Sequence, residues 1–329
     1  MKKVHILIVL TSLVCTLFMG CKKSSKANAS NAAAVDPARL SEVIVYTYDS
    51  FCGEWGSGPE IARLFEEKTG IKVNFIDCGD GVQILSKAML EKADPYADVL
   101  LGLDNNLTDK AAQSGVFESF KPSNASVLAE GLEEELGGNW LMTPYDYSPF
   151  AIIWNSLSEV PAPSCLEDLT KDIYKKKLIL MDARTSTPGL GFETWVNKVY
   201  GSKATDFMKR LEPSILTMAP GWSVGYGMFT DGEAPLVISY TTSPAYHIEY
   251  GEGDQFKALS FTDGHVMQVE GAGLVKGAKN PDGAKKFIEF LISEEAQNVI
   301  PTTQWMYPSN AQIVMPACYD TIEMPKVLK

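Results

Sequence analysis

The chain has 329 residues, of which 45% are hydrophobic and 21% charged, and its formal net charge is −12. These values are ordinary for a soluble globular protein of one or two domains. The acidic balance argues against a nucleic-acid partner, which would require clustered Lys and Arg, and it mildly favours a cationic ligand.

The N-terminal residues have the pattern of an export signal. Two lysines precede an apolar run from Ile6 to Gly20, which has the length of a signal-peptide h-region and is too short for a comfortable membrane span. Because the small residue Gly20 stands directly before Cys21, the pattern predicts a lipoprotein signal, with Cys21 as the lipidated N-terminus after cleavage. The alternative is an ordinary signal peptide followed by an incidental cysteine.

The residues that follow Cys21 are rich in Lys, Ser, Asn and Ala and show no apolar periodicity. We expect residues 1–20 to be the signal peptide and residues 21–40 to be a flexible tether. The protein is then an exported, membrane-anchored lipoprotein that faces the periplasm. No later segment of the sequence resembles a transmembrane helix.

Strands and helices alternate along the next part of the chain. The β-branched, aromatic or apolar segments expected to be strands are Val43–Tyr48, Ile71–Phe75 and Ala97–Leu101. A helix is expected from Gly58-Pro59 through Lys68, and the apolar spacing of Val82, Leu85 and Met89 marks a second helix. This order is typical of a parallel sheet in an α/β domain.

Two more extended segments are predicted further along, at Trp140–Trp154 and at Val266–Val275, and Asn280-Pro281 then opens a helix. Ligands of open α/β sheets bind at the carboxyl ends of the strands. The loops expected at those ends, which are rich in Gly, Asp, Asn and aromatic residues, are 48–58, 77–81 and 102–106.

Motifs of common enzyme and metal chemistry are missing from the sequence. Its three histidines are scattered, and it has no HExxH and no Walker loop. We therefore expect a binding protein without catalytic residues, metal or cofactor. The cysteine spacing suits neither a zinc site nor a dithiol motif and leaves open whether Cys52 and Cys78 form a disulfide.

Seven segments carry a further signal between about Val43 and Asn310. They are VYTYDSF (45–51), GDGVQIL (79–85), LLGLDNNL (100–107), DARTSTPGLG (182–191), GWSVGYG (221–227), SYTTSPAYH (239–247) and IPTTQWMYP (300–308). In this order and spacing they resemble the periplasmic thiamine-binding proteins of ABC importers. The resemblance implies a type II periplasmic-binding-protein fold of α/β class, in which two lobes, each a mainly parallel sheet flanked by helices, are joined by a hinge.

The resemblance also implies the organisation and the partners of the chain. Residues 41–145 with 268–304 are expected to form the first lobe, and residues 146–267 with 305–329 the second. The ligand would be thiamine, thiamine monophosphate or thiamine diphosphate. The protein would be a monomer that delivers this ligand to an ABC permease and its ATPase.

The resemblance places the ligand in an aromatic cleft between the lobes. The residues that match family binding positions are Tyr48, Asp80, Gly81, Ser186, Thr187, Trp222, Tyr240, Thr241, Thr242, Ser243, Tyr246 and Trp305. Thiamine carries a permanently cationic thiazolium, which aromatic faces bind with about 0.5–2 kcal/mol per good contact. We expect Trp222, Tyr240 and Trp305 to stack on the ligand, although the same residue types also fill ordinary cores.

The polar positions have two interpretations each. Asp80 either contacts the ligand or caps the helix that begins at Gly81. Ser186 and Thr187 either contact the hydroxyethyl or phosphate end of the ligand or simply cap the helix that begins near Pro188.

Two other functions compete with thiamine capture. Thiamine-cleaving enzymes of type I share the fold and use a Cys nucleophile, a role for which Cys78 is the candidate because it lies two residues before Asp80. A binder of another solute, such as ferric iron, phosphate or a sugar, is the second alternative.

Overall fold

A computed structural model describes residues 37–329. The expected signal peptide over residues 1–20 and the lipidation site Cys21 lie outside the described residues, as does most of the tether expected over residues 21–40. The described part begins with a 3-10 helix, Pro37–Ser41. Within it, no helix combines the length and the apolar character that crossing a bilayer requires.

The first lobe is built on the strand order β2-β1-β3-β10. Its strands are β1 (Glu42–Thr47), β2 (Lys72–Asp77), β3 (Val99–Asp104) and β10 (Met267–Val275), with the short β4 (Phe117–Glu118) beside β10. β1 pairs in parallel with β2 and β3, whereas β10 runs antiparallel to β3. β3 extends beyond the predicted end at Leu101 because Leu103 and Asp104 still pair with β10.

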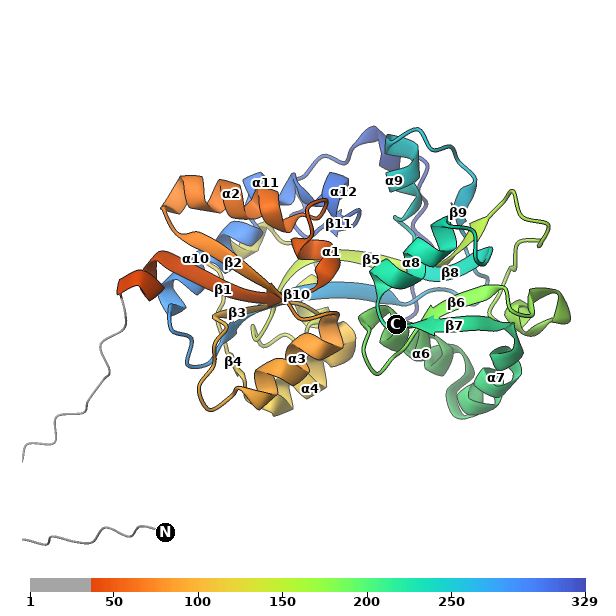
Figure 1. The fold of residues 1–329 in the computed structure, drawn as a ribbon, viewed down its shortest axis with the longest axis horizontal. Helices are drawn as coiled ribbons and strands as arrows, with labels where there is room; N and C mark the ends of the chain where they lie inside the picture. Colours follow the sequence, from red (N-terminus) through yellow and green to blue (C-terminus); the bar gives the residue numbers. More distant parts are fainter. Residues whose placement is uncertain (1–36) are drawn as a thin grey trace, which may run out of the picture. The chain divides into compact units, whose positions relative to one another are not determined.

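Helices cover both faces of this sheet (Figure 1). They are α1 (Asp49–Cys52), α2 (Gly58–Thr69), α3 (Gly81–Leu90), α4 (Thr108–Ser114), α5 (Leu132–Glu135), α10 (Pro281–Leu291), α11 (Glu294–Gln297) and α12 (Ile300–Thr303). α2 and α10 start at the predicted Gly-Pro and Asn-Pro pairs. α2 ends at Gly70, whose φ of 71° lies in the left-handed region that favours glycine.

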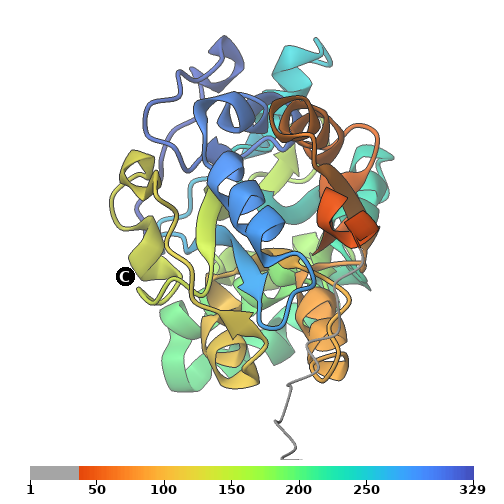
Figure 2. The same ribbon diagram turned by 90° about the vertical axis from the view of Figure 1, so that its left-hand side faces the viewer.

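The packing of α2 against α10 closes one side of the first lobe. Figure 2 shows the two helices side by side. The ring of Phe65 in α2 lies 5.4 Å from that of Phe287 and 5.5 Å from that of Phe290 in α10, centroid to centroid. On α3, Ile84 and Leu85 face the core, while Met89 is 42% exposed and lies at the edge of the helix's buried face.

The second lobe continues the sheet in the order β5-β8-β6-β7. Its strands are β5 (Thr143–Asn155), β6 (Leu178–Met181), β7 (Ile215–Ala219), β8 (Leu236–Tyr240) and β9 (Phe256–Ala258). Its helices are α6 (Thr187–Tyr200), α7 (Ala204–Leu211), α8 (Trp222–Thr230) and α9 (Pro244–Glu249). β6 is parallel to β7 and β8, and β5 is antiparallel to β8.

β5 and β10 run side by side between the two groups of strands (Figure 1). The first half of β5 pairs with β10 and with β11 (Tyr307–Pro308), and its second half pairs with β8 and β9. The buried apolar side chains form one large cluster on each side of this crossing. The predicted two-lobed α/β fold is therefore confirmed.

β5 starts later than the predicted Trp140 because Trp140 has a φ of 55°, which a strand residue does not adopt.

The four cysteines of the described residues are free thiols. Loss of a native disulfide typically costs about 2–5 kcal/mol, so a bridge between Cys52 and Cys78 would make stability sensitive to reductant. We expect the thermal unfolding midpoint to be the same with and without dithiothreitol. Alkylation of the denatured, unreduced protein should label both cysteines, and a protected Cys52–Cys78 pair would contradict the structure.

Candidate functional site

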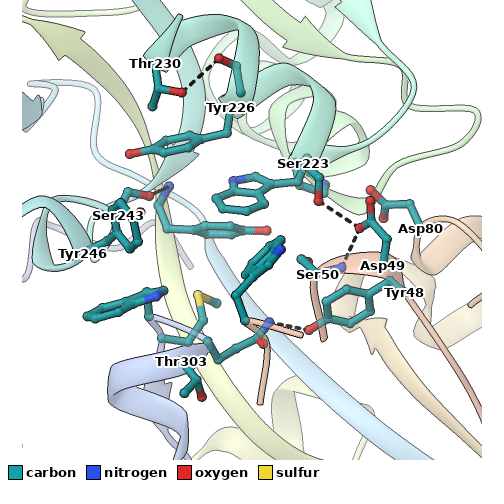
Figure 3. A pocket seen from close by; sticks show the side chains of 18 of the residues that line it. Tyr48, Asp49, Ser50, Asp80, Ser223, Tyr226, Thr230, Ser243, Tyr246 and Thr303 are labelled. Carbon is teal, nitrogen blue, oxygen red and sulfur yellow. Dashed lines mark hydrogen bonds between the residues drawn. The ribbon is translucent and has the colours of Figure 1, made fainter. Parts of the chain in front are cut away.

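A cavity of about 520 Å³ opens where the two lobes meet. This volume is in the range of small-molecule sites. Its walls come from α1, from the start of α3 and from β10 on the first lobe, and from the starts of α6 and α8, the end of β8 and α9 on the second. The segment after α12 closes one side. Figure 3 shows the side chains from these elements converging on one space.

Eight aromatic side chains line the described part of the wall. The aromatic lining residues are Tyr48, Trp55, Trp222, Tyr226, Tyr240, Tyr246, Tyr250 and Trp305. Trp222 stacks on Tyr226 with the ring centroids 4.9 Å apart and the planes 16° from parallel, and its Nε1–H donates to Ser239 Oγ at 2.8 Å. Trp305 meets Tyr246 edge-on, with the centroids 5.4 Å apart. These contacts fix the ring orientations before any ligand arrives.

The charged side chains of the wall all have the same sign. Asp49, Asp80, Glu252 and Glu270 line the cavity, and none of its described lining residues is Lys, Arg or His. A cavity whose described lining has carboxylates and no basic group attracts a cation and disfavours an anion.

Asp80 is the helix cap that the sequence suggested, and it also joins the lobes. Its Oδ1 accepts the N–H of Gly81 at 2.6 Å, and its own N–H donates to Gln83 Oε1 at 3.0 Å, which completes a capping box on α3. The same Oδ1 accepts the N–H of Thr187 at 3.1 Å, at the start of α6 in the other lobe. Burial raises the pKa of Asp80, while the N–H groups of Thr187, Gly81 and Trp222 act in the opposite direction.

A second contact between the lobes involves Asp49. Ser223 Oγ at the start of α8 donates to Asp49 Oδ1 at 2.9 Å, a contact visible in Figure 3. Burial raises the pKa of Asp49, and the Ser223 hydrogen bond lowers it. The starts of α6 and α8 in the second lobe are thus each held by a carboxylate of the first.

Glu270 lies at the floor of the cavity in a network of hydroxyl groups. It is 5% exposed, and its Oε2 accepts the hydroxyls of Tyr48 at 2.8 Å and Tyr145 at 3.0 Å. The Gln304 amide in turn donates to the Tyr48 hydroxyl at 2.6 Å. The Tyr48 ring is therefore held in place by its hydroxyl as well as by packing.

Most of the sequence-predicted residues meet in this cavity. The predicted residues that line it are Tyr48, Asp80, Thr187, Trp222, Tyr240, Ser243, Tyr246 and Trp305. The predicted residues that do not line it are Gly81, Ser186, Thr241 and Thr242, all of them buried.

Each of these four residues has another partner or position. The hydroxyls of Thr241 and Thr242 both lie 3.1 Å from Ser148 Oγ in β5. Ser186 is the fully buried residue before α6, and Gly81 is the first residue of α3. Arg184 is the basic residue nearest in sequence to Ser186. Its side chain is 88% exposed and pairs with Asp182.

Sequence reasoning missed several lining residues. They are Asp49, Ser50, Trp55, Pro188, Ser223, Tyr226, Gly227, Thr230, Tyr250, Glu252, Glu270, Thr303, Gln304 and Met306. Ser223 and Tyr226 belong to the segment GWSVGYG, whose helical spacing places both on one face of α8. Glu270 had its own signal, because it is the one carboxylate in the apolar run Val266–Val275.

The competing functions lack support at this site. Cys78 does not line the cavity, and burial raises the pKa of its thiol to about 11, so the thiol is protonated and weakly nucleophilic at neutral pH. Residues 37–329 contain no group of three or more His, Cys, Asp or Glu side chains placed to hold a metal ion.

Comparisons with known proteins identify the family. The family described as bacterial extracellular solute-binding protein matches residues 57–298. The chain is 40% identical over 287 residues to the thiamine-binding periplasmic protein of Brucella abortus biovar 1, covering 87% of this chain and 84% of that protein. It is 39% identical over 284 residues to the thiamine-binding periplasmic protein of Escherichia coli, covering 85% of this chain and 84% of that protein.

A solved structure titled periplasmic thiamin binding protein matches with a TM-score of 0.81 and 38% identity, over 88% of this chain and 89% of that one. The chain therefore belongs to the bacterial extracellular solute-binding proteins, and within them to the family of the periplasmic thiamine-binding proteins.

Proposed function

We propose that this protein captures thiamine in the aromatic cavity and delivers it to the membrane permease of an ABC importer. One observation carries the proposal: among the described residues, the wall combines eight aromatic side chains with four carboxylates and no basic residue. Thiamine needs such a wall, because it presents a permanently cationic ring and a flat aminopyrimidine. Like its relatives, the chain is a periplasmic binding protein and not an enzyme.

Phosphorylated forms are expected to bind more weakly than thiamine itself. The start of α6 offers N–H groups to an anion, but the Asp80 carboxylate already accepts the N–H of Thr187 there. Since no basic residue of the described part of the chain lines the cavity, each added phosphate meets carboxylates without a compensating cation. We propose the affinity order thiamine, thiamine monophosphate, thiamine diphosphate.

We also propose the cellular arrangement that the sequence predicts. Cys21 carries the lipid anchor after removal of residues 1–20, and the tether joins the folded body to the membrane. The tether was expected over residues 21–40, but the folded body already begins with the 3-10 helix Pro37–Ser41, where Arg39 pairs with the buried Asp98 at 2.7 Å. Residues 41–145 with 268–304 form one lobe, and 146–267 with 305–329 the other. A monomer then presents both lobes to the permease, which works with a cytoplasmic ATPase.

Calorimetric titration tests the ligand. The protein is denatured and refolded to remove carried-over ligand and is then titrated with thiamine, its two phosphates and pyridoxine as control. We expect one-to-one binding of the thiamine forms and no binding of pyridoxine. Absence of heat and of any change in tryptophan fluorescence with every thiamine form would refute the ligand assignment.

A further inference from the structure

Two carboxylates face each other on the strands that connect the lobes. Glu270 in β10 pairs directly with Asp146 in β5, and cross-strand partners place their side chains on the same face of a sheet. Asp146 is fully buried, and Glu270 is 5% exposed and lines the cavity. One carboxylate of the pair therefore faces the ligand space, and the other lies behind it.

The hydrogen-bond donors around the pair are unevenly shared. Tyr48 and Tyr145 both donate to Glu270 Oε2, whereas neither oxygen of Asp146 accepts a hydrogen bond from any described group. An ionised buried carboxylate without donors is strongly disfavoured. Asp146 gains a hydrogen bond with Glu270 only if it keeps its proton, because its O–H can then donate to the Glu270 carboxylate. Burial and the neighbouring Glu270 raise the pKa of Asp146 well above its usual range.

None of the described groups that act on this carboxylate pair carries a positive charge. The titratable groups that face Glu270 from the surrounding elements are Tyr48 at the end of β1, Tyr145 and Asp146 in β5, Asp80 at the start of α3, Asp104 at the end of β3 and Tyr240 at the end of β8. All of these groups are acidic or neutral. Burial raises the pKa of Glu270 to about 7, against the lowering effect of the Tyr48 hydrogen bond.

We propose that Glu270 is the anionic subsite for the cationic ring of the ligand, that Asp146 supports it as a neutral acid, and that binding of the cation releases the proton from Glu270. This inference rests on the proposed function and adds the group that balances the ligand's charge. The released proton passes to the solvent. Aromatic faces alone would hold a cation at any pH, whereas this subsite holds it only when Glu270 is ionised.

The sign of the pH dependence follows from this linkage. At pH values above the range in which Glu270 titrates, its carboxylate is already ionised, so binding releases no proton and the affinity is constant. At lower pH, binding must first remove the proton from Glu270. The affinity therefore falls as the pH falls, by up to about tenfold per pH unit. Within the titration range of Glu270, binding releases a fraction of one proton.

The test is a thiamine titration between about pH 5.5 and 8.5 in two buffers of different ionisation enthalpy, which reports affinity and proton release together. For the wild type we expect the profile just described. Glu270→Gln should lose the pH dependence and the proton release and bind about 10- to 100-fold more weakly at high pH. Glu118→Gln is the matched control, because it removes an exposed carboxylate from β4 beside β10 and should keep the wild-type profile.

Asp146 is a positioning residue, and its test is the midpoint of the same profile. Asp146→Ala removes the donor to Glu270 and should move the midpoint to higher pH. Asp146→Asn restores an N–H donor and should bring the midpoint back toward the wild type. Equal midpoints in all three proteins would remove Asp146 from the proposal, while circular dichroism checks that each variant folds.

The outcomes separate this inference from the proposed function. Thiamine binding that is independent of pH, with Glu270→Gln equal to the wild type, overturns the subsite and leaves thiamine capture intact. If thiamine does not bind at all, the ligand assignment fails, and choline, a simple quaternary cation, becomes the probe. Binding of choline that weakens at low pH and is lost in Glu270→Gln supports the subsite, and its absence overturns it.

Discussion

Replacing Trp222 or Trp305 by alanine is expected to weaken thiamine binding about 2- to 30-fold in each case, while the protein still folds. Trp222 stacks on Tyr226 and is oriented by its hydrogen bond to Ser239, so its ring is ready to receive a flat cationic partner. Alanine at this position removes one aromatic face and admits water to the cavity. Since neither tryptophan is fully buried, the loss of stability should be smaller than for a core aromatic.

The backbone of Trp305 has an unusual conformation for a bulky residue. Its φ of 60° lies in the left-handed region, and it follows α12 where a glycine commonly ends a helix, with its N–H donating to Ile300 O at 3.1 Å. A bulky residue in this conformation costs about 1–3 kcal/mol. We therefore expect the Trp305 ring to serve binding rather than stability.

Two substitutions at this position separate binding from stability. Trp305→Gly should relieve the backbone strain and match or exceed Trp305→Ala in thermal stability, although both variants lose the ring and bind thiamine weakly. Trp140→Ala is the matched control, because Trp140 also has a positive φ and does not line the cavity. Unchanged thiamine affinity in both Trp222→Ala and Trp305→Ala would eliminate the aromatic cavity as the binding site.

Local patterns predicted the elements that carry the site. The Gly-Pro and Asn-Pro pairs fixed the starts of α2 and α10, and the β-branched run before Tyr48 predicted β1, because capping and strand preference act over a few residues. The seven segments brought most lining residues to the correct loops. The helix starts and the strand depend on neighbours in sequence, which is why they could be predicted without the structure, whereas the site residues came from the resemblance of the seven segments to the thiamine-binding proteins.

Features that depend on distant neighbours could not be predicted in the same way. Thr241 and Thr242 belong to a polar segment typical of a site, yet their hydroxyls face Ser148 on β5, a partner that only the sheet register brings near. Glu270 and Asp146 meet through the same kind of long-range pairing. The sequence identifies such residues as unusual, but their partners depend on the register between strands.

Replacing Gly81 by alanine is expected to reduce thiamine affinity at least as strongly as the tryptophan substitutions, although Gly81 does not line the cavity. A Cβ at this position would lie 2.5 Å from Gly102 O in β3 and 2.6 Å from Thr187 Cγ2 at the start of α6. The first atom belongs to the same lobe and the second to the other lobe. Overpacking of this kind typically costs about 1–3 kcal/mol, which corresponds to about 5- to 150-fold in affinity if binding requires the lobes to meet here.

The reason lies in the neighbouring carboxylate. Any shift of α3 that relieves the contact with Thr187 also moves Asp80 away from the N–H groups of Thr187 and Trp222, which it holds across the lobes. Thiamine titration of Gly81→Ala, together with small-angle scattering with and without thiamine, tests this consequence. We expect weak binding and no compaction on addition of the ligand. Wild-type affinity in Gly81→Ala would show that binding tolerates a gap at this contact.

A second substitution identifies which of the two close contacts matters. Thr187→Ser removes the methyl group that the new Cβ would meet and keeps the hydroxyl and N–H that Asp80 accepts. If the contact between the lobes is decisive, Gly81→Ala combined with Thr187→Ser should bind thiamine more tightly than Gly81→Ala alone, after correction for the effect of Thr187→Ser by itself. If the clash with Gly102 O dominates, the combined variant should gain nothing, and the lower affinity would then arise from distortion of the first lobe alone.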